Sequence, residues 1–111
     1  MDTPVAWIDL IEGILTEETR VPVSYGEIDL YIVFDRAQGH YLLMAVGWEG
    51  HKRVHAPLIH VDIIEGKIWI QHDGTERGVA RDLEAAGIPK DHIVLAFQHI
   101  NRRRHGDYAA A

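Results

Sequence analysis

The chain of 111 residues has no cysteine and only one serine, and both shortages exclude whole classes of chemistry. Without cysteine there are no disulfides, no thiolate metal sites and no cysteine nucleophile. With Ser24 as the only serine, no Ser/His/Asp arrangement can be assembled. We therefore expect a protein that is not an enzyme and that has no cofactor and no catalytic or metal-binding residues.

Long apolar runs and an excess of basic charge are also missing. No apolar stretch approaches the roughly 18–20 residues of a membrane span. The N-terminus, Met1 to Pro4, lacks the basic start and apolar stretch of a secretory signal, so we expect a cytoplasmic location. Lys and Arg number 11 against 17 Asp and Glu, which gives a formal charge of −6. This balance is not typical of an independent DNA-binding protein.

The acidic charge is concentrated in the N-terminal third of the chain. Residues 1–35 hold eight acids and one base, a charge of −7, whereas the remaining nine acids and ten bases nearly cancel. The only dense basic stretch is Arg102, Arg103 and Arg104 near the C-terminus. A solvated tail is the simplest interpretation of these arginines, and contact with nucleic acid or with an acidic partner are the alternatives.

The hydrophobic pattern predicts a single α+β domain over residues 1–111. Apolar residues recur every three or four positions over 5–20, which predicts a helix with Thr3 as its N-cap, Pro4 as its first residue and Pro22 as its stop. Alternating patterns then predict a four-stranded antiparallel β-meander with strands at 27–35, 41–48, 53–64 and 67–73. The expected order after the meander is a second helix at about 76–86 that ends at Gly87, a short C-terminal strand within 92–97, and an irregular tail at 98–111.

The turns set the expected register of the sheet. Two-residue hairpin loops are predicted at Gly50-His51 and Glu65-Gly66. Between the first two strands a five-residue loop, 36–40, is preferred to a four-residue loop, 36–39, because it sets Ile32 opposite Met44 on the aliphatic face. The two helices are expected to cover that aliphatic face.

The opposite face of the sheet is unusually apolar for a face exposed to solvent. A contiguous apolar patch rimmed by charge usually marks a protein interface, and aromatic residues are common in interfaces. The alternatives are that these are scattered apolar surface residues or that the C-terminal extension covers this face. The predicted interface, with a second copy or another protein, comprises Tyr31, Val33, Tyr41, Leu43, Leu58 and Trp69.

Eight histidines raise the question of a metal or acid–base site. His60 and Asp62 share the second sheet face, and Gln71 is expected across from His60. Because no third strong ligand is evident on neighbouring strands, we interpret His60 as a cross-strand or interface residue. A small metal-dependent enzyme at His60 and Asp62 is the alternative. His72 is expected on the core face at the end of its strand.

Several local signatures within residues 5–97 occur in an order that resembles the XisI family, the fdxN-element excision controlling factors of cyanobacteria. The more specific ones are Gly66-Lys67-Ile68-Trp69-Ile70-Gln71-His72-Asp73-Gly74-Thr75-Glu76 and Gly87-Ile88-Pro89-Lys90-Asp91-His92-Ile93-Val94-Leu95. Residues 98–108 depart from the family pattern, which has prolines and a single arginine in this region.

The resemblance implies a helix-flanked antiparallel sheet and an accessory role in programmed DNA rearrangement, with no known active site. It also implies a companion protein, the XisH-type factor, and a separate site-specific recombinase that cuts and rejoins the DNA. We therefore expect a homo-oligomeric interaction module that works by protein contact and meets nucleic acid only weakly or through a partner. The alternative is a direct DNA-binding accessory factor that uses Arg102, Arg103 and Arg104.

Overall fold

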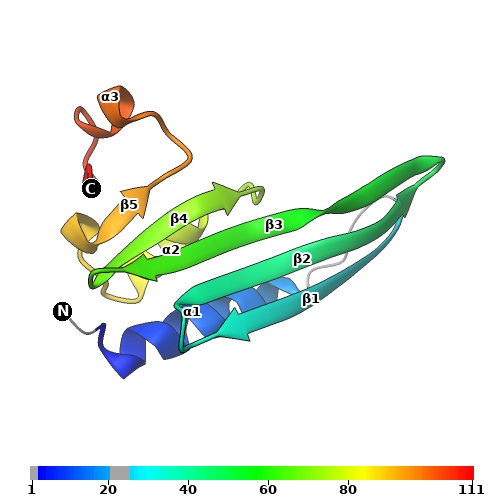
Figure 1. Cartoon of the computed structure of the whole chain (residues 1–111), viewed down its shortest axis with the longest axis horizontal. Coiled ribbons are helices and arrows are strands. Elements are labelled where there is room, and N and C mark those ends of the chain that lie inside the picture. The colour runs from blue at the N-terminus through cyan, green and yellow to red at the C-terminus, as the bar shows by residue number, and fades with distance from the viewer. Residues whose placement is uncertain (1–2, 21–25) are drawn as a thin grey trace.

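The computed structural model of the protein describes residues 3–20 and 26–111 (Figure 1). The elements in chain order are α1 (Val5–Glu18), β1 (Glu27–Asp35), β2 (His40–Glu49), β3 (Lys52–Ile64), β4 (Lys67–Asp73), α2 (Val79–Ala85), the short 3-10 helix η1 (Lys90–His92), β5 (Ile93–Leu95) and α3 (Ile100–Arg103). Within those two ranges, no helix has the length and apolar character needed to cross a membrane.

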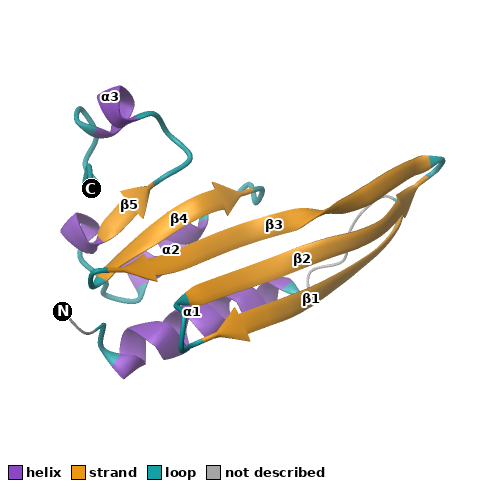
Figure 2. Ribbon diagram, in the orientation of Figure 1, coloured by secondary structure: helices purple, strands orange, loops and turns teal. Residues whose placement is uncertain are grey.

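In the described part of the chain, the strands form one five-stranded sheet in the order β1-β2-β3-β4-β5. The first four strands are the predicted antiparallel meander, and β5 joins parallel to β4. The α+β prediction is therefore confirmed. Both main helices lie on one side of the sheet, and the β2–β3 hairpin projects beyond them (Figure 2). The two-residue hairpin loops are also confirmed, because Glu49 pairs with Lys52 and Ile64 with Lys67.

The hydrophobic core lies between the two helices and the aliphatic face of the sheet. Ile11 and Leu15 of α1 and Leu83 of α2 are fully buried. They belong to one cluster with the sheet residues Tyr41, Leu43, Ile59, Val61, Ile68 and Ile70. Each fully buried aliphatic side chain contributes about 1.5–3 kcal/mol of transfer free energy, so this shared core holds the helices on the sheet.

The boundaries of α1 differ slightly from the predicted ones. Pro4 is the N-cap residue, and no side chain caps the helix, so the predicted N-cap role of Thr3 is wrong. The helix ends at Glu18, two residues earlier than predicted. Pro22 lies outside the described residues.

The predicted register of β1 against β2 is wrong by one residue. The turn between these strands spans four residues, 36–39, so Ile32 pairs with Leu43 and not with Met44. Because side chains alternate along a strand, every side chain of β2 points to the face opposite to the predicted one. Tyr41 and Leu43, two of the predicted interface residues, are consequently buried in the core.

Gly39 makes this short turn possible. Its φ is +75°, and a Cβ at this position would lie 2.9 Å from the carbonyl oxygen of Ile63. The Gly39 N–H donates to the Asp35 carbonyl at 2.8 Å, and the Gly39 carbonyl accepts from the Ile63 N–H at 2.9 Å. The Asp35 carboxylate also accepts from the backbone N–H of Gln38 at 3.0 Å. These bonds close the turn and attach it to β3.

Arg36 attaches the same turn to α1. Its Nε and Nη2 donate to the two carboxylate oxygens of Glu12, both at 2.8 Å, and Nη2 also donates to Asp9 at 2.7 Å. The hydrogen bond from Arg36 holds the pKa of Glu12 below its ordinary value. Part of the acidic charge of α1 is therefore already paired within the molecule.

Two β-bulges adjust the pairing farther along the sheet. Leu58 is an extra residue of β3 opposite β2, and Gln71 is an extra residue of β4 opposite β3. Leu58, a predicted interface residue, packs against the core instead. His72 pairs with His60 and is exposed, so its predicted place on the core face is wrong.

Helix α2 begins later than predicted because the side chain of Asp73, six residues before the helix, accepts a hydrogen bond from its first residue. The Asp73 carboxylate accepts hydrogen bonds from the backbone N–H of Val79 at 2.7 Å and of Thr75 at 2.9 Å, which delays the helix start to Val79. Gly87 follows the helix with φ +100°, and its N–H donates to the Glu84 carbonyl at 2.9 Å. This left-handed residue ends the helix, as predicted.

Residues 98–111, which the sequence pattern predicts to be irregular, include α3 and then return to the sheet. Ala109 forms an isolated parallel bridge with Val94, and its N–H donates to the Ile93 carbonyl at 2.9 Å. The Tyr108 hydroxyl donates a hydrogen bond to the Glu84 carboxylate on α2. Burial, together with this hydrogen bond, raises the pKa of Tyr108 to about 12.

Two glycine substitutions are expected to change stability in opposite directions. A Cβ at Gly47 would lie 1.9 Å from the Glu27 carbonyl oxygen, so Gly47→Ala forces β1 away from β2 and lowers the free energy of unfolding. A Cβ at Gly13, on the exposed side of α1, meets nothing within 4 Å. Gly13→Ala therefore raises the free energy of unfolding by up to about 1 kcal/mol, the helix preference of alanine over glycine. Urea unfolding measures both, and a Gly47→Ala variant as stable as the wild type would contradict the β1–β2 pairing.

The Tyr108–Glu84 contact predicts a stability loss in alkaline solution. The folded pKa of Tyr108, about 12, exceeds the ordinary tyrosine value of 10, so the stabilisation is complete below pH 10 and is lost as pH rises through about 12. Tyr108→Phe is expected to be less stable than the wild type at pH 8, with a difference that shrinks between pH 10 and 12. Chemical unfolding across this range tests it, with Tyr31→Phe on the exposed face as the control. A constant difference would contradict the assignment.

Candidate functional sites

The observed register brings together three side chains on the sheet face opposite the helices. His40, the first residue of β2, lies directly opposite Asp62 of β3, and His60 precedes Asp62 by two residues on the same face. The Asp62 Oδ1 accepts hydrogen bonds from His40 Nδ1 at 2.7 Å and from His60 Nε2 at 2.8 Å. The Gln71 amide donates to the other carboxylate oxygen at 3.2 Å. His40 is the third member that strand periodicity alone did not reveal.

The Asp62 carboxylate is the centre of this cluster. Among the described residues, it is the only charged side chain in the buried class, with 9% of the residue exposed. Burial alone raises the pKa of Asp62, but the hydrogen bonds from His40 and His60 outweigh burial and hold the pKa below its ordinary value. The cluster opens to solvent at His40, whose side chain is 51% exposed. Two imidazoles around an ionised carboxylate can hold a cation or exchange protons.

The free edge of the sheet at β1 is a second candidate site. β1 is the outermost strand, and its consecutive residues Tyr31, Ile32 and Val33 are 46%, 38% and 47% exposed. An outer strand presents unpaired backbone N–H and C=O groups, and soluble proteins usually protect such edges from association. Three consecutive exposed apolar residues on an edge strand make this surface a candidate binding site. Tyr31 and Val33 are the members of the predicted interface that stay on an open face.

Trp69, the remaining member of the predicted interface, is partly covered by the C-terminal segment. The Arg103 guanidinium lies 5.8 Å from the centre of the Trp69 ring. Arg103 also donates to the Ala110 carbonyl at 2.8 Å and to the Gln98 carbonyl at 2.6 Å. The three arginines consequently differ: Arg103 fastens the C-terminal segment, whereas Arg102 and Arg104 are exposed.

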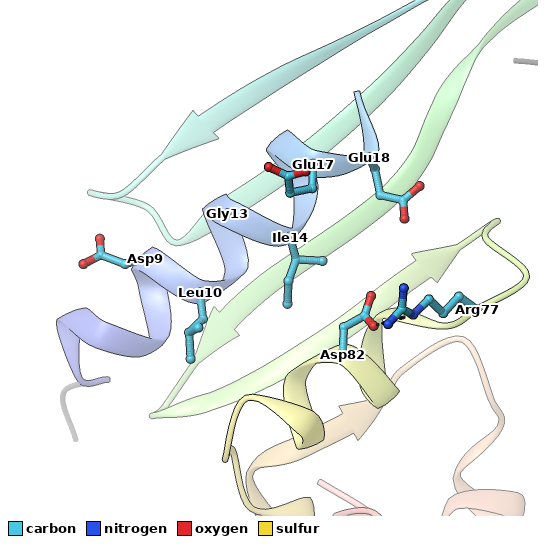
Figure 3. A pocket seen from close by; sticks show the side chains of 8 residues that line it. All are labelled: Asp9, Leu10, Gly13, Ile14, Glu17, Glu18, Arg77 and Asp82. Carbon is cyan, nitrogen blue, oxygen red and sulfur yellow. Dashed lines mark ion pairs between the residues drawn. The ribbon is translucent and has the colours of Figure 1, made fainter. Parts of the chain in front are cut away.

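An open groove of about 570 Å³ lies on the helix side, between α1 and α2 (Figure 3). Leu10 and Ile14 supply apolar surface. The acids that line it are Asp9, Glu17, Glu18 and Asp82, and the Asp82 carboxylate pairs with Arg77 at 2.9 Å. A groove with this charge repels a phosphate backbone.

The arginine cluster gives a test that separates its members. Arg103→Ala removes two charged hydrogen bonds and the contact with Trp69, and is expected to lower the free energy of unfolding by about 1–3 kcal/mol. Arg104→Ala, the matched control, removes an exposed side chain and is expected to change it by less than about 0.5 kcal/mol. Urea unfolding measures both variants, and equal effects would contradict the anchoring role of Arg103.

Comparison with known proteins confirms the resemblance seen in the sequence. The model of the XisI protein family matches residues 1–110. The crystal structure of a XisI-like protein from Anabaena variabilis is 36% identical, with a TM-score of 0.87 over 96% of this chain and 98% of that chain. The crystal structure of the fdxN element excision controlling factor XisI from Anabaena variabilis is 29% identical, with a TM-score of 0.79 over 93% and 94%. No curated protein matches the chain. The chain, which has the fold of these two proteins and matches the family model along nearly all of its length, belongs to the XisI family.

Proposed function

We propose that the protein is a non-enzymatic accessory factor that controls the excision of a DNA element by contacting a XisH-type companion and a site-specific recombinase. Membership of the XisI family and similarity to an fdxN element excision controlling factor support this role. In this proposal the recombinase carries out the cutting and rejoining of DNA. The present chain acts by binding.

The observation that carries the contact is the exposed apolar edge at β1. An extended segment of a partner can pair with an edge strand through main-chain hydrogen bonds, while alternate side chains supply specificity. Tyr31 and Val33 offer the apolar contact on the open face. The acids Glu27, Asp29 and Asp35 lie at the two ends of the strand. The edge therefore suits a companion segment that is apolar at its centre and basic at its ends.

The charge distribution favours an indirect contact with DNA. The chain carries −6 overall, and the groove between α1 and α2 is lined mainly by acids. Because each DNA phosphate is also negative, the long-range interaction of the N-terminal third with DNA is repulsive. Arg102 and Arg104 are left for at most a weak contact at the C-terminal end.

The companion contact is tested by introducing a charge into the exposed edge. Val33→Glu places a carboxylate in the apolar strip and is expected to reduce co-purification with a XisH-type companion by at least about tenfold, since desolvating an unpaired charge costs several kcal/mol. Val5→Glu is the matched control, because Val5 is 62% exposed at the start of α1 and far along the chain from β1.

Co-purification, with the mass of each complex measured in solution, distinguishes the outcomes. Loss of the companion from Val33→Glu and its retention by Val5→Glu support the proposal. Equal retention by both variants overturns the assigned edge. If Val33→Glu only converts a homo-oligomer to a monomer and still binds the companion, the edge joins copies of this chain, and the companion contact lies elsewhere.

A further inference from the structure

We propose that His40, His60 and Asp62 form a binding site for one divalent transition-metal ion of the Zn²⁺ class. One ligand atom from each residue lies within 4.8 Å of the other two. The site is distinct from the β1 edge and does not depend on the proposed role in DNA excision.

The donor set decides the kind of ion. Two imidazole nitrogens and one carboxylate oxygen suit Zn²⁺ and its neighbours, whereas Mg²⁺ and Ca²⁺ prefer ligand shells made of oxygen. Three protein ligands leave a further position of a tetrahedral ion for water. The exposure of the His40 side chain gives the ion a path from solvent.

The carboxylate is already oriented for such an ion. The Gln71 amide holds Oδ2 of Asp62 at 3.2 Å, while Oδ1 faces both imidazoles. In metal sites, carboxylates that bind the ion are commonly held in place by hydrogen bonds from residues that do not bind it. Gln71 holds Asp62 in this way. Gln71 is the extra residue of the β-bulge between β3 and β4, so this register shift lies beside the cluster.

The distances require only a small adjustment. Ligand atoms around a tetrahedral ion with bonds of about 2.1 Å lie roughly 3.4 Å apart, so the 2.7 Å and 2.8 Å contacts must open by several tenths of an ångström. The exposed His40 ring can move by this amount. Each imidazole must present an unprotonated nitrogen to the ion, and a neutral imidazole achieves this by carrying its proton on the other ring nitrogen.

Charge is the reason that a cation is favoured here. Within the described residues the ion-pair partners of Asp62 are His40 and His60, which are charged only when protonated. Neither lysine nor arginine is among these described partners. A divalent ion supplies the positive charge that a buried carboxylate otherwise receives from a basic side chain.

The test is calorimetric titration of untagged, chelator-treated protein with Zn²⁺, followed by visible absorption of the Co²⁺ form to report nitrogen and oxygen ligands. The wild type is expected to bind one ion per chain, and His40→Ala and His60→Ala to weaken binding by at least about tenfold. His51→Ala is the control, because His51 is an exposed histidine in the two-residue turn between β2 and β3 and is not part of the cluster. Its affinity is expected to stay within about twofold of the wild type.

His40→Ala keeps the test decisive even if other changes unfold the protein, since the His40 side chain is half exposed. The fold of each variant is checked by thermal unfolding in the presence of the chelator. Absence of saturable one-to-one binding to the wild type overturns the site. Equal affinity of the wild type and a folded His40→Ala variant also overturns it.

Discussion

The four-residue turn at 36–39 decides which side chains of the sheet meet the helices and which meet solvent. A strand exposes alternate residues on opposite faces, so one more residue in this turn exchanges the two faces of β2 relative to β1. The turn is held from two sides: Gly39 donates a hydrogen bond to Asp35 and accepts one from Ile63, and Arg36 pairs with Glu12 of α1. A slipped register would expose Tyr41 and Leu43, both completely buried. Each exposed large apolar side chain costs about 1.5–3 kcal/mol, which makes the observed register strongly preferred.

Most of the fold could be predicted from the sequence because most of its signals are local. The apolar stripe of α1, the alternation of the strands, the two-residue hairpin loops and the stop at Gly87 each depend on residues a few positions apart. The register of β1 depends instead on contacts between distant segments. The preference for a longer loop assumed that Leu42 lies opposite Ile59 on the aliphatic face, but the extra residue Leu58 in β3 places Leu43 there instead. The bulges at Leu58 and Gln71 likewise satisfy neighbouring strands and have no local signature.

The candidate sites also depend partly on local signals, which the sequence shows, and partly on contacts between distant segments, which it does not show. That His60 and Asp62 share a face is a local statement about one strand, and it is correct. His40 lies opposite Asp62 only because Leu58 is an extra residue in β3, so its place in the cluster depends on the non-local pairing of β2 with β3. The three consecutive arginines look alike in the sequence, and only the return of the chain at Ala110 shows that Arg103 is used internally. Tyr31 and Val33 remain on an open face because β1, where they lie, is the outermost strand.

The turn also links the two surfaces to which we assign binding. In the sheet, Val33 of β1 pairs with Leu42 of β2, and Leu42 pairs with His60 of β3. Neighbouring strands lie about 4.8 Å apart, so the exposed edge and the histidine cluster are separated by roughly 10 Å across the same face. An ion held by His40 and Asp62 connects β2 to β3 immediately after the turn. Since β1 reaches the rest of the sheet through β2, such an ion strengthens the support of the edge strand without occupying the surface that a partner would contact.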